Sequence, residues 1–531
     1  MSSTTVDTSS LPESAPPRAP GSRRANPWLT LVAVAIGLFM VNLDASVVAI
    51  ANPEIGRDLK ASTAGLQWVT NAYLLAMAAL LILGGKLGDR FGRHTVYMVG
   101  TVGFTLASVA IALSGSIEGV ITFRAVQGVF AALLIPNTLG LLRAVFPPHR
   151  FGMAVGLWAM VASCSTALGP IVGGLLIEHV NWESVFFVNA PIGVVALVVS
   201  LLVLPRSKDS TGHHRFDVAG VILLGAGLVA LVFGVVKGET WGWTSGGTLG
   251  SIAAGLVLLA VFCRYESGLG HPLLPMRLFR NRSLAIGTVV TAINFFVLLG
   301  VIFFVMLYLQ NVRGFTPVES GVRTLPLSLA TVVAAPLGAA LTQRFGPRLS
   351  MPVGMVLQAA ASLWMLTWDA GSPYAALWPP FLAIGLGVGM VMSASSDAIV
   401  GNAPKRDGGV AGGLQATSLQ VGGALGTSVL VSLISGKVGS TLVGELTSAG
   451  VPATAAAGFR GAGDAVAMGV APVSDGMPAQ LRAAVVEGSG NAFMNGVHSA
   501  VVVTAVLCTV GALLAGIGMR RGGTAPETTA G

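Results

Sequence analysis

Long apolar runs separated by short polar turns dominate this chain of 531 residues. A transmembrane helix needs about 20 apolar residues in succession, and runs of that length recur almost from end to end. The pattern predicts fourteen membrane-spanning helices over residues 28–50, 66–84, 95–114, 119–142, 152–178, 184–204, 217–237, 247–264, 284–310, 321–343, 350–368, 376–400, 408–435 and 493–518. Backbone polar groups find no solvent partner in hydrocarbon, so we expect an all-α integral membrane protein.

The positions of the cationic residues predict how these helices are oriented. If the N-terminus is cytoplasmic and the helices alternate, 21 of the 30 Lys and Arg residues fall in cytoplasmic segments, 8 fall outside, and Arg124 lies within a span. Loops rich in Lys and Arg stay on the cytoplasmic side. The bias therefore favours an even number of helices with both termini in the cytoplasm.

A partial repeat divides the chain into two similar halves. Residues 87–94 share Leu and Arg-Phe-Gly, in register, with residues 341–348, at an offset of 254 residues. The same offset places the first span on the ninth. We therefore predict two six-helix halves and an extra helix pair between them, a plan found in transporters.

The predicted organisation follows from these boundaries. The domains are a disordered cytoplasmic tail over 1–27, an N-terminal half over 28–204, an inserted helix pair with flanking cytoplasmic loops over 205–283, a C-terminal half over 284–518 with an external loop at 436–492, and a cytoplasmic tail over 519–531.

Composition supports the membrane class and excludes others. Only 10% of the residues are charged and the mean hydropathy is +0.79, whereas soluble domains carry about 25% charged residues. The net charge of +8 lies in turns between apolar runs, so it indicates topology rather than nucleic-acid binding. The sequence contains no Walker phosphate-binding loop, HExxH or GxSxG motif. We predict no cofactor, no metal site and no catalytic residue.

Two opposite charges are expected inside the membrane. Asp44 lies in the first span and Arg124 early in the fourth, both in the outer half of the bilayer. Such charges are costly and should face a partner or a cavity, and Gln127 shares a helical face with Arg124. The pair is interpreted either as a proton-coupling site or as a purely structural charge network. Asp44 alone is also accounted for by a structural polar contact, or by a position near enough to the outer surface to be hydrated.

Two glycine-rich stretches stand out. Residues 85–94 hold Gly85, Asp89, Arg90, Gly92 and Arg93, and mixed charges in so short a connector predict an ion-paired turn between adjacent antiparallel helices.

The second stretch lies in span five. It contains Gly169, Pro170, Gly173 and Gly174, and its composition alone is accounted for by a kinked helix that packs closely on its neighbours.

These stretches together resemble the major facilitator superfamily, and in particular its fourteen-helix drug:proton antiporters. The resemblance rests on six segments that match the signature turn, the first-, fourth- and fifth-helix motifs and two later patterns of the subfamily, at residues 85–93, 43–53, 124–128, 169–174, 182–193 and 271–275. It implies that the turn with Asp89 and Arg90 gates conformational change. It also implies that Arg124 takes part in proton transfer, and that the glycines of span five mark an exporter.

We therefore predict a multi-pass protein of the cytoplasmic membrane that exports amphipathic organic compounds or antibiotics in exchange for protons. It is expected to be a monomer in the lipid bilayer, to bind its small-molecule substrate and protons, and to bind no nucleic acid. Two alternatives are an exporter of an endogenous metabolite and a sensor of transporter fold that moves no substrate.

Overall fold

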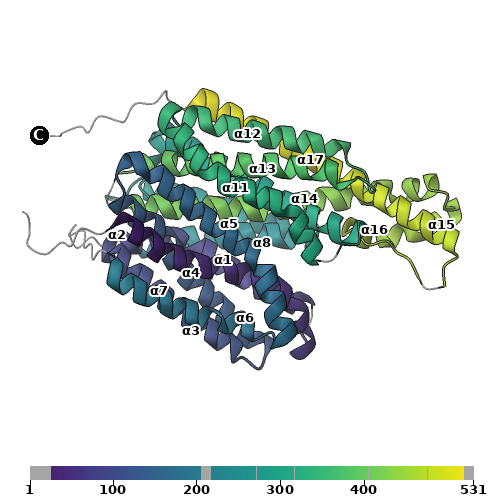
Figure 1. The fold of residues 1–531 in the computed structure, drawn as a ribbon, viewed down its shortest axis with the longest axis horizontal. Helices are drawn as coiled ribbons and strands as arrows, with labels where there is room; N and C mark the ends of the chain where they lie inside the picture. The colour runs from purple at the N-terminus through teal and green to yellow at the C-terminus, as the bar shows by residue number, and fades with distance from the viewer. Residues whose placement is uncertain are drawn as a thin grey trace, which may run out of the picture.

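The computed structural model describes residues 26–61, 63–204, 217–270, 272–315, 317–404, 407–474 and 476–519. Within these ranges all regular structure is helical (Figure 1). The long helices are α1 (Pro27–Asp58), α2 (Thr63–Phe91), α3 (Arg93–Ala112), α4 (Ile117–Val145), α5 (Pro148–His179), α7 (Asn189–Val203), α8 (Val218–Trp241), α9 (Gly246–Glu266), α10 (Arg282–Leu307), α11 (Pro317–Phe345), α12 (Pro347–Trp364), α13 (Tyr374–Ser396), α14 (Gly408–Ser448) and α17 (Ala479–Gly518). The predicted disordered tails lie almost wholly outside the described residues.

Each predicted span coincides with a long helix, and short α6 (Ser184–Phe187) leads into α7. Among the described residues, twelve helices are long and apolar enough to cross a membrane. In the other two, α5 and α8, the apolar stretches are shorter, at Met153–Thr166 and Ala219–Val235. The protein is therefore a multi-pass membrane protein, while the full count of fourteen spans stays a prediction.

Helix packing repeats between the two halves. In the first half α4 packs on α2 and α3, and α1 packs on α5 and α7. In the second half α13 packs on α11 and α12, and α10 packs on α14 and α17. The two sets of contacts correspond helix for helix, as the partial sequence repeat predicts.

The inserted pair lies beside both halves. Helices α8 and α9 pack on each other, and α8 also contacts α2 of the first half and α14 of the second. Only 17% of the most apolar stretch of α9 is buried, so α9 forms the outer layer of the pair.

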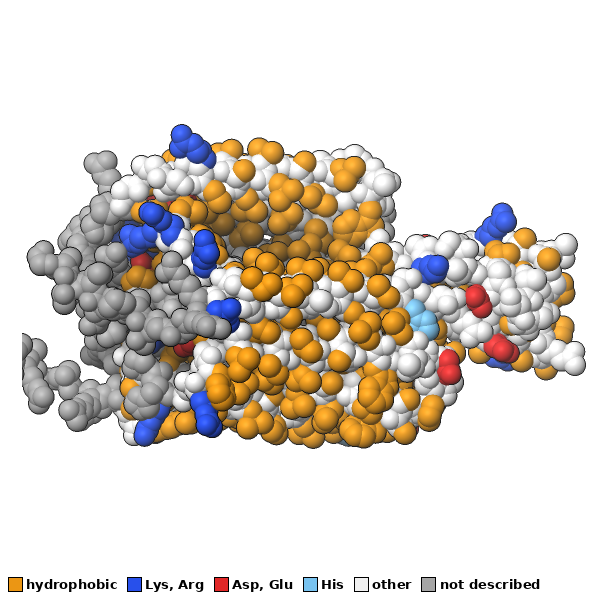
Figure 2. Space-filling model, turned by 90° about the horizontal axis from the view of Figure 1, so that it is seen from above, with side chains coloured by type: hydrophobic (Ala, Val, Ile, Leu, Met, Phe, Trp, Pro, Cys, Tyr) orange, Lys and Arg blue, Asp and Glu red, His pale blue; other side chains and the backbone are white. Residues whose placement is uncertain are grey.

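The two ends of the molecule differ in charge, and each contains a different set of helix termini. We call the end where α1 begins and α17 ends the terminal end, and the opposite one the distal end (Figure 1). Lys and Arg side chains gather near the terminal end, and a broad hydrophobic surface separates them from charged groups at the distal end (Figure 2). This arrangement is typical of a protein that lies across a bilayer.

The predicted loop at 436–492 is largely helical. Helices α14 and α17 hold 41 and 40 residues, about 60 Å each at 1.5 Å per residue, twice the thickness of the hydrocarbon core. Together with α15 (Ala453–Gly458) and α16 (Gly463–Ala467) they form the projection at the right of Figure 1. We call this the distal extension. Leu442, Leu446 and Val485 of the extension belong to the same apolar cluster as the core of the second half.

The predicted turn at 85–94 is also more helical than expected. Helix α2 continues to Phe91 and α3 begins at Arg93, so only Gly92 connects them. Gly92 has a φ of 94°, a conformation that glycine adopts at low cost. Asp89 and Arg90 therefore lie on the last turn of α2 rather than in a loop.

Candidate functional site

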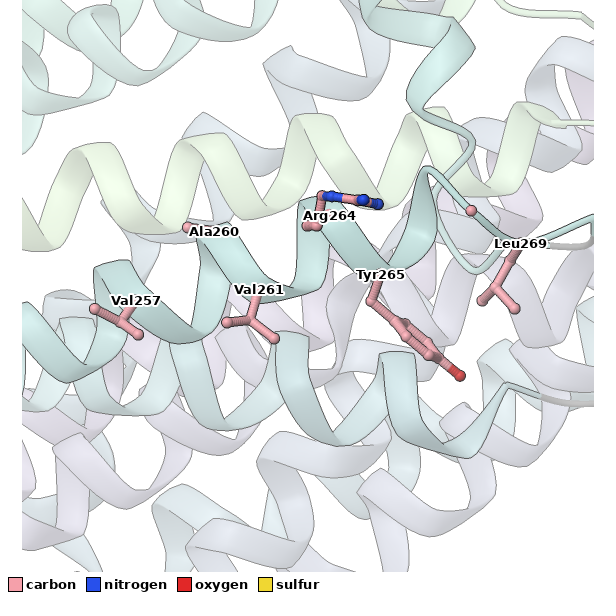
Figure 3. Close-up of a pocket in the computed structure, with 7 residues that line it drawn as sticks. Val257, Ala260, Val261, Arg264, Tyr265 and Leu269 are labelled. Carbon is pink, nitrogen blue, oxygen red and sulfur yellow. The ribbon is translucent and has the colours of Figure 1, made fainter.

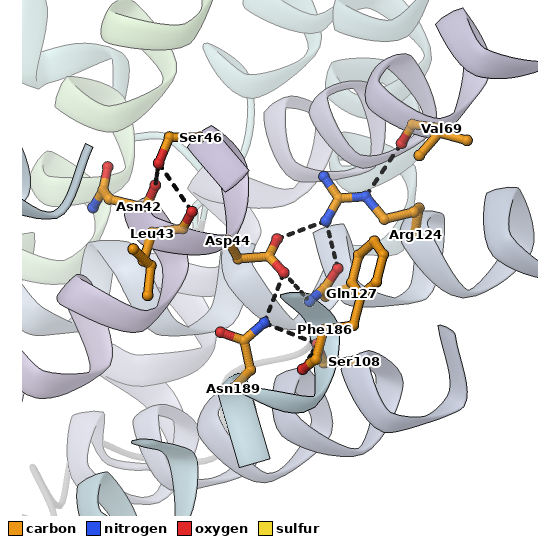
Figure 4. A network of polar contacts seen from close by, with 10 residues as sticks. All are labelled: Asn42, Leu43, Asp44, Ser46, Val69, Ser108, Arg124, Gln127, Phe186 and Asn189. Carbon is orange, nitrogen blue, oxygen red and sulfur yellow. Dashed lines mark hydrogen bonds and ion pairs between the residues drawn. The ribbon is translucent and has the colours of Figure 1, made fainter. Parts of the chain in front are cut away.

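The two charges expected within the membrane form a buried ion pair. A terminal guanidinium nitrogen of Arg124, on α4, lies 2.6 Å from Oδ2 of Asp44, on α1 (Figure 4). Both side chains are 1% exposed or less. Asp44 lies near the middle of α1 and Arg124 two turns into α4, which runs in the opposite direction, so the two helices bring the charges to the same depth.

Neutral amides complete the coordination of the carboxylate. Oδ1 of Asp44 accepts hydrogen bonds from the side-chain amides of Gln127 at 3.0 Å and Asn189 at 2.8 Å. The Gln127 carbonyl oxygen in turn accepts from Arg124 at 2.6 Å. Asn189 also donates to Ser108 at 2.9 Å, which donates to the carbonyl of Phe186. Side chains of α4 and α7 thus contact the carboxylate on α1, and Ser108 of α3 positions Asn189.

Arg124 has two further contacts that fix its position. Its Nε donates to the carbonyl of Val69 at 3.2 Å, and its guanidinium carbon lies 4.2 Å from the ring centroid of Tyr73. Stacking on an aromatic ring favours a guanidinium over an ammonium group. The hydroxyl of Tyr73 is buried and has no hydrogen-bond partner among the described residues.

The carboxylate of Asp44 is therefore compensated by one cation and two amide donors within a buried cluster. Charged groups inside a membrane are costly and commonly mark functional positions.

The glycines predicted to pack closely in span five do so next to this site. A side chain at Gly169 would place its Cβ 1.9 Å from Oγ of Ser46, two residues from Asp44, and one at Gly173 would lie 3.1 Å from Val47. A Cβ at Gly174 would meet no atom within 4 Å. Gly169 and Gly173 therefore set the distance between α5 and α1, whereas Gly174 does not. Pro170 lies within α5.

Asp89 connects the two halves at the terminal end. Its Oδ1 accepts from Nη2 of Arg93 at 2.8 Å and from the backbone N–H of Gly409 at 3.0 Å, and its Oδ2 accepts from Val410 N–H at 3.2 Å. Gly409 and Val410 begin α14 of the second half. A carboxylate at a helix N-terminus satisfies its free N–H groups and its dipole. We call this contact the latch.

The glycines around Asp89 allow the latch to close. A Cβ on Gly85 would lie 2.1 Å from the carbonyl oxygen of Gly409, so α2 and α14 touch backbone to backbone. Arg93 also donates to the carbonyl of Gly140 on α4 at 2.9 Å, and the guanidinium of Arg90 lies 5.2 Å from the ring centroid of Phe91.

Three further cations join separate segments at this end. Arg143 of α4 donates to the carbonyl of Gly401, after α13, at 2.8 Å. Lys86 of α2 donates to the carbonyl of Pro272 at 3.0 Å. Arg277 lies 3.0 Å from the carboxylate of Asp407. The terminal end is thus closed by contacts between the halves and with the segment that follows α9.

Sequence reasoning missed three members of the buried site. Asn189, Ser108 and Tyr73 received no role, although Asn189 lies in the stretch at 182–193 that carries part of the resemblance. A single amide in an apolar run does not reveal the direction in which it points. Asn137, by contrast, donates to the carbonyl of Gly84 on α2 at 3.0 Å, a contact between two helices.

A groove of about 700 Å³ runs along α9 (Figure 3). It is lined by Val257, Ala260, Val261, Arg264, Tyr265, Gly268 and Leu269. None of these residues belongs to the helices around Asp44, so the groove is separate from the buried site. The part of the chain that the structure describes contains no group of three or more His, Cys, Asp or Glu residues placed to hold a metal ion.

Known proteins share both the sequence and the fold. The family model described as Major Facilitator Superfamily matches residues 34–427. The tetracenomycin C resistance and export protein of Streptomyces glaucescens is 44% identical over 93% of this chain and 91% of its own length. The puromycin resistance protein pur8 of Streptomyces alboniger is 35% identical over 83% and 88%. The solved human organic anion transporter MFSD10 (TETRAN) is 12% identical, with a TM-score of 0.60 over 92% of this chain and 99% of its own, and shows the same fold.

Proposed function

The chain belongs to the major facilitator superfamily, and from that premise we propose that it exports amphipathic organic compounds, antibiotics among them, in exchange for protons. The observation that carries the proposal is the buried ion pair between Asp44 and Arg124 at 2.6 Å. A charge pair in the membrane interior is costly. If a proton replaces Arg124 as the partner of Asp44 during transport, the pair couples proton movement to export, which a purely structural contact would not do.

The substrate class follows from the relatives and from the site. Two relatives carry names that state resistance to tetracenomycin C and to puromycin, and the first name adds export. We propose that this chain handles compounds of similar size and mixed polarity. Asp44 would serve as counter-charge for basic compounds whenever Arg124 withdraws. A second candidate is export of an endogenous metabolite, which is equally compatible with a name that states export.

Alternating access would use the latch. The described structure is closed at the terminal end by Asp89 and its contacts with α14, a state in which the substrate path would open toward the distal end. We propose that the terminal end faces the cytoplasm, because Lys and Arg gather there (Figure 2). The chain would act as a monomer in the cytoplasmic membrane.

Inside-out membrane vesicles provide the test. We expect vesicles that carry the chain to accumulate a basic fluorescent dye and radiolabelled puromycin when a proton gradient is imposed, and to lose both when an uncoupler is added. The matched control is Asp44→Asn, at equal membrane content. Accumulation that is unaffected by the uncoupler, or is equal in the control variant, would refute the proposal. Competition by extracts of the host's own metabolites would separate the two substrate candidates.

A further inference from the structure

Two carboxyl groups face each other at the terminal end of the inserted helix pair. Asp217 precedes the first residue of α8, and Glu266 is the last residue of α9. Both lie over Gly220, because a Cβ built there would be 2.2 Å from Oδ2 of Asp217 and 2.4 Å from Oε1 of Glu266. The two oxygens therefore occupy the same small space.

Neither of the facing oxygens receives a hydrogen bond from another described group. Oδ2 of Asp217 and Oε1 of Glu266 are both buried and without a partner, and Glu266 as a whole is 1% exposed. Two acceptors in contact repel each other, and a buried acceptor without a donor is costly. One proton held between them satisfies both, as it does in carboxyl pairs that share a proton.

The other oxygens are already occupied. Oδ1 of Asp217 accepts from the backbone N–H of Gly220 at 2.9 Å and from the hydroxyl of Tyr265 at 3.2 Å. Oε2 of Glu266 accepts from the N–H of Leu274 at 3.2 Å. Each carboxyl group is thus held in place, and only the facing oxygens are left for a proton.

Among the described residues, no cation is bound to the pair. Tyr265 is the titratable group that contacts it from α9, and Arg264 points to a different side of the same helix (Figure 3). Among the described residues of α2 and of the segment that follows α9, the ammonium of Lys86 is bound to Pro272 and the guanidinium of Arg277 to Asp407.

The pair is also linked to the latch through the segment that follows α9. Glu266 accepts a hydrogen bond from the backbone N–H of Leu274. Lys86 of α2 donates to the carbonyl of Pro272, and Arg277 forms an ion pair with Asp407. Asp407 directly precedes the first turn of α14, which Asp89 contacts. Release of Leu274 by Glu266 would therefore loosen a segment that holds α2 and the start of α14 together.

We infer that Asp217 and Glu266 form a second proton-binding site, separate from Asp44, which keeps the latch closed when it is occupied. A proton enters from the aqueous phase at the terminal end through the partly exposed Asp217. When it leaves, two adjacent carboxylates repel each other, the start of α8 and the end of α9 separate, and the segment after α9 loosens. The inference uses the latch of the proposed function, but it requires neither a drug substrate nor coupling at Asp44.

The test measures the distance across the terminal end rather than transport. Spin labels are attached to cysteines that replace exposed Arg150, at the start of α5, and exposed Leu349, at the start of α12, in a protein whose three native cysteines are replaced by serine. The wild-type protein in lipid nanodiscs should shift from closed toward open as pH rises. One proton changes such an equilibrium by up to about tenfold per pH unit.

Glu266→Gln places an amide donor where the proton would lie and keeps the bond to Leu274, and Asp217→Asn does the same from the other side. Both should remain closed at every pH tested. The matched control Glu118→Gln, an exposed carboxylate at the distal end, should behave like the wild type. A wild-type distance that does not respond to pH, or a response unchanged in Glu266→Gln and Asp217→Asn, would overturn the inference.

Two further measurements distinguish a failure of the latch from a failure of the carboxyl pair. Asp89→Asn should open the terminal end at all pH values, and if it does not, the latch itself is wrong whatever the carboxyl pair does. Infrared titration of the wild-type protein should show a protonated carboxyl band, and this band should be lost in Glu266→Gln or, if that variant does not fold, in Asp217→Asn. Closure that depends on Mg²⁺ at constant pH would indicate a metal ion in place of the proton and would refute the inference.

Discussion

Removal of the Arg124 side chain is the sharpest perturbation of the buried site. Arg124→Ala leaves the carboxylate of Asp44 with its two amide donors, Gln127 and Asn189, and no cation. It also leaves the carbonyl of Val69 without its donor. The Asp44 side chain is 0% exposed, so water does not replace the lost charge.

The size of the stability loss follows from the buried charge that is left without its partner. Breaking a buried ion pair by removing one partner costs about 3–5 kcal/mol. We expect the free energy of unfolding to fall by about 3 kcal/mol, and proton-driven export to fall about 100-fold.

Two matched variants separate charge from structure. Arg124→Lys keeps a cation but loses the planar group that reaches both Asp44 and Val69, so we expect about a tenfold loss of export. Asp44→Asn/Arg124→Ala contains no charge in the cluster, and should regain about 2 kcal/mol of stability without regaining coupling. Stability is measured by chemical unfolding in detergent, and export by uptake into inside-out vesicles.

Several results would refute this reasoning. If Arg124→Ala retains proton-driven export at normal membrane levels, the pair is a structural contact and the coupling step lies elsewhere. If the double variant is no more stable than Arg124→Ala, the loss comes from packing around Tyr73 or Val69 rather than from an uncompensated charge.

Three other predictions concern the latch, the helix contact and the topology. Asp89→Asn removes a carboxylate that accepts hydrogen bonds from Arg93, Gly409 and Val410. The free energy that favours the closed terminal end should fall by about 2 kcal/mol, a shift of roughly thirtyfold toward the open state. Export should fall while membrane insertion is normal, and an unchanged export rate would contradict this. Gly169→Ala should destabilise the protein by about 1–3 kcal/mol because its methyl group meets Ser46. Gly174→Ala should change stability by less than about 0.5 kcal/mol. Equal effects in unfolding experiments would show that Gly169 does not set the distance between α5 and α1. Thr447→Cys, exposed on the distal extension, should react with a membrane-impermeant thiol reagent in intact cells, and labelling only after permeabilisation would reverse the proposed topology.

The helical plan and the meeting of Asp44 with Arg124 could be predicted because both depend on simple regularities. Apolar runs of about 20 residues have one stable conformation in a bilayer, and alternating helices place each residue at a calculable depth. Two opposite charges at one depth then have a strong reason to pair. The correspondence between halves was also predictable, because the partial repeat fixes the same helix order twice.

The boundaries of charged and glycine-rich segments were not predictable in the same way. Asp89 and Arg90 suggested a turn, but charged residues also suit the last turn of a helix that emerges from the membrane, and only Gly92 interrupts α2 and α3. In the same way, residues 436–448 are polar enough to leave the bilayer and yet continue α14. Hydropathy reports where a helix leaves the membrane, not where it ends.

Contacts between distant helix ends were hidden for a different reason. Asp217 and Glu266 are 49 positions apart in the sequence. Their meeting depends on the angle at which α8 packs on α9, which no sequence pattern specifies. Asn189 is similar, since the rotation of α7 decides whether its amide faces lipid or Asp44.

The length of α14 gives the molecule a mechanical lever. One uninterrupted helix of about 60 Å runs from Gly409, where Asp89 holds it, to Ser448 in the distal extension. If α14 pivots at the latch, a tilt of about 10° displaces its far tip by roughly 10 Å. In that case the distal extension would convert a small tilt near the latch into a large displacement of its tip. A fluorophore or antibody fragment placed there would register each opening of the latch without touching the transport path.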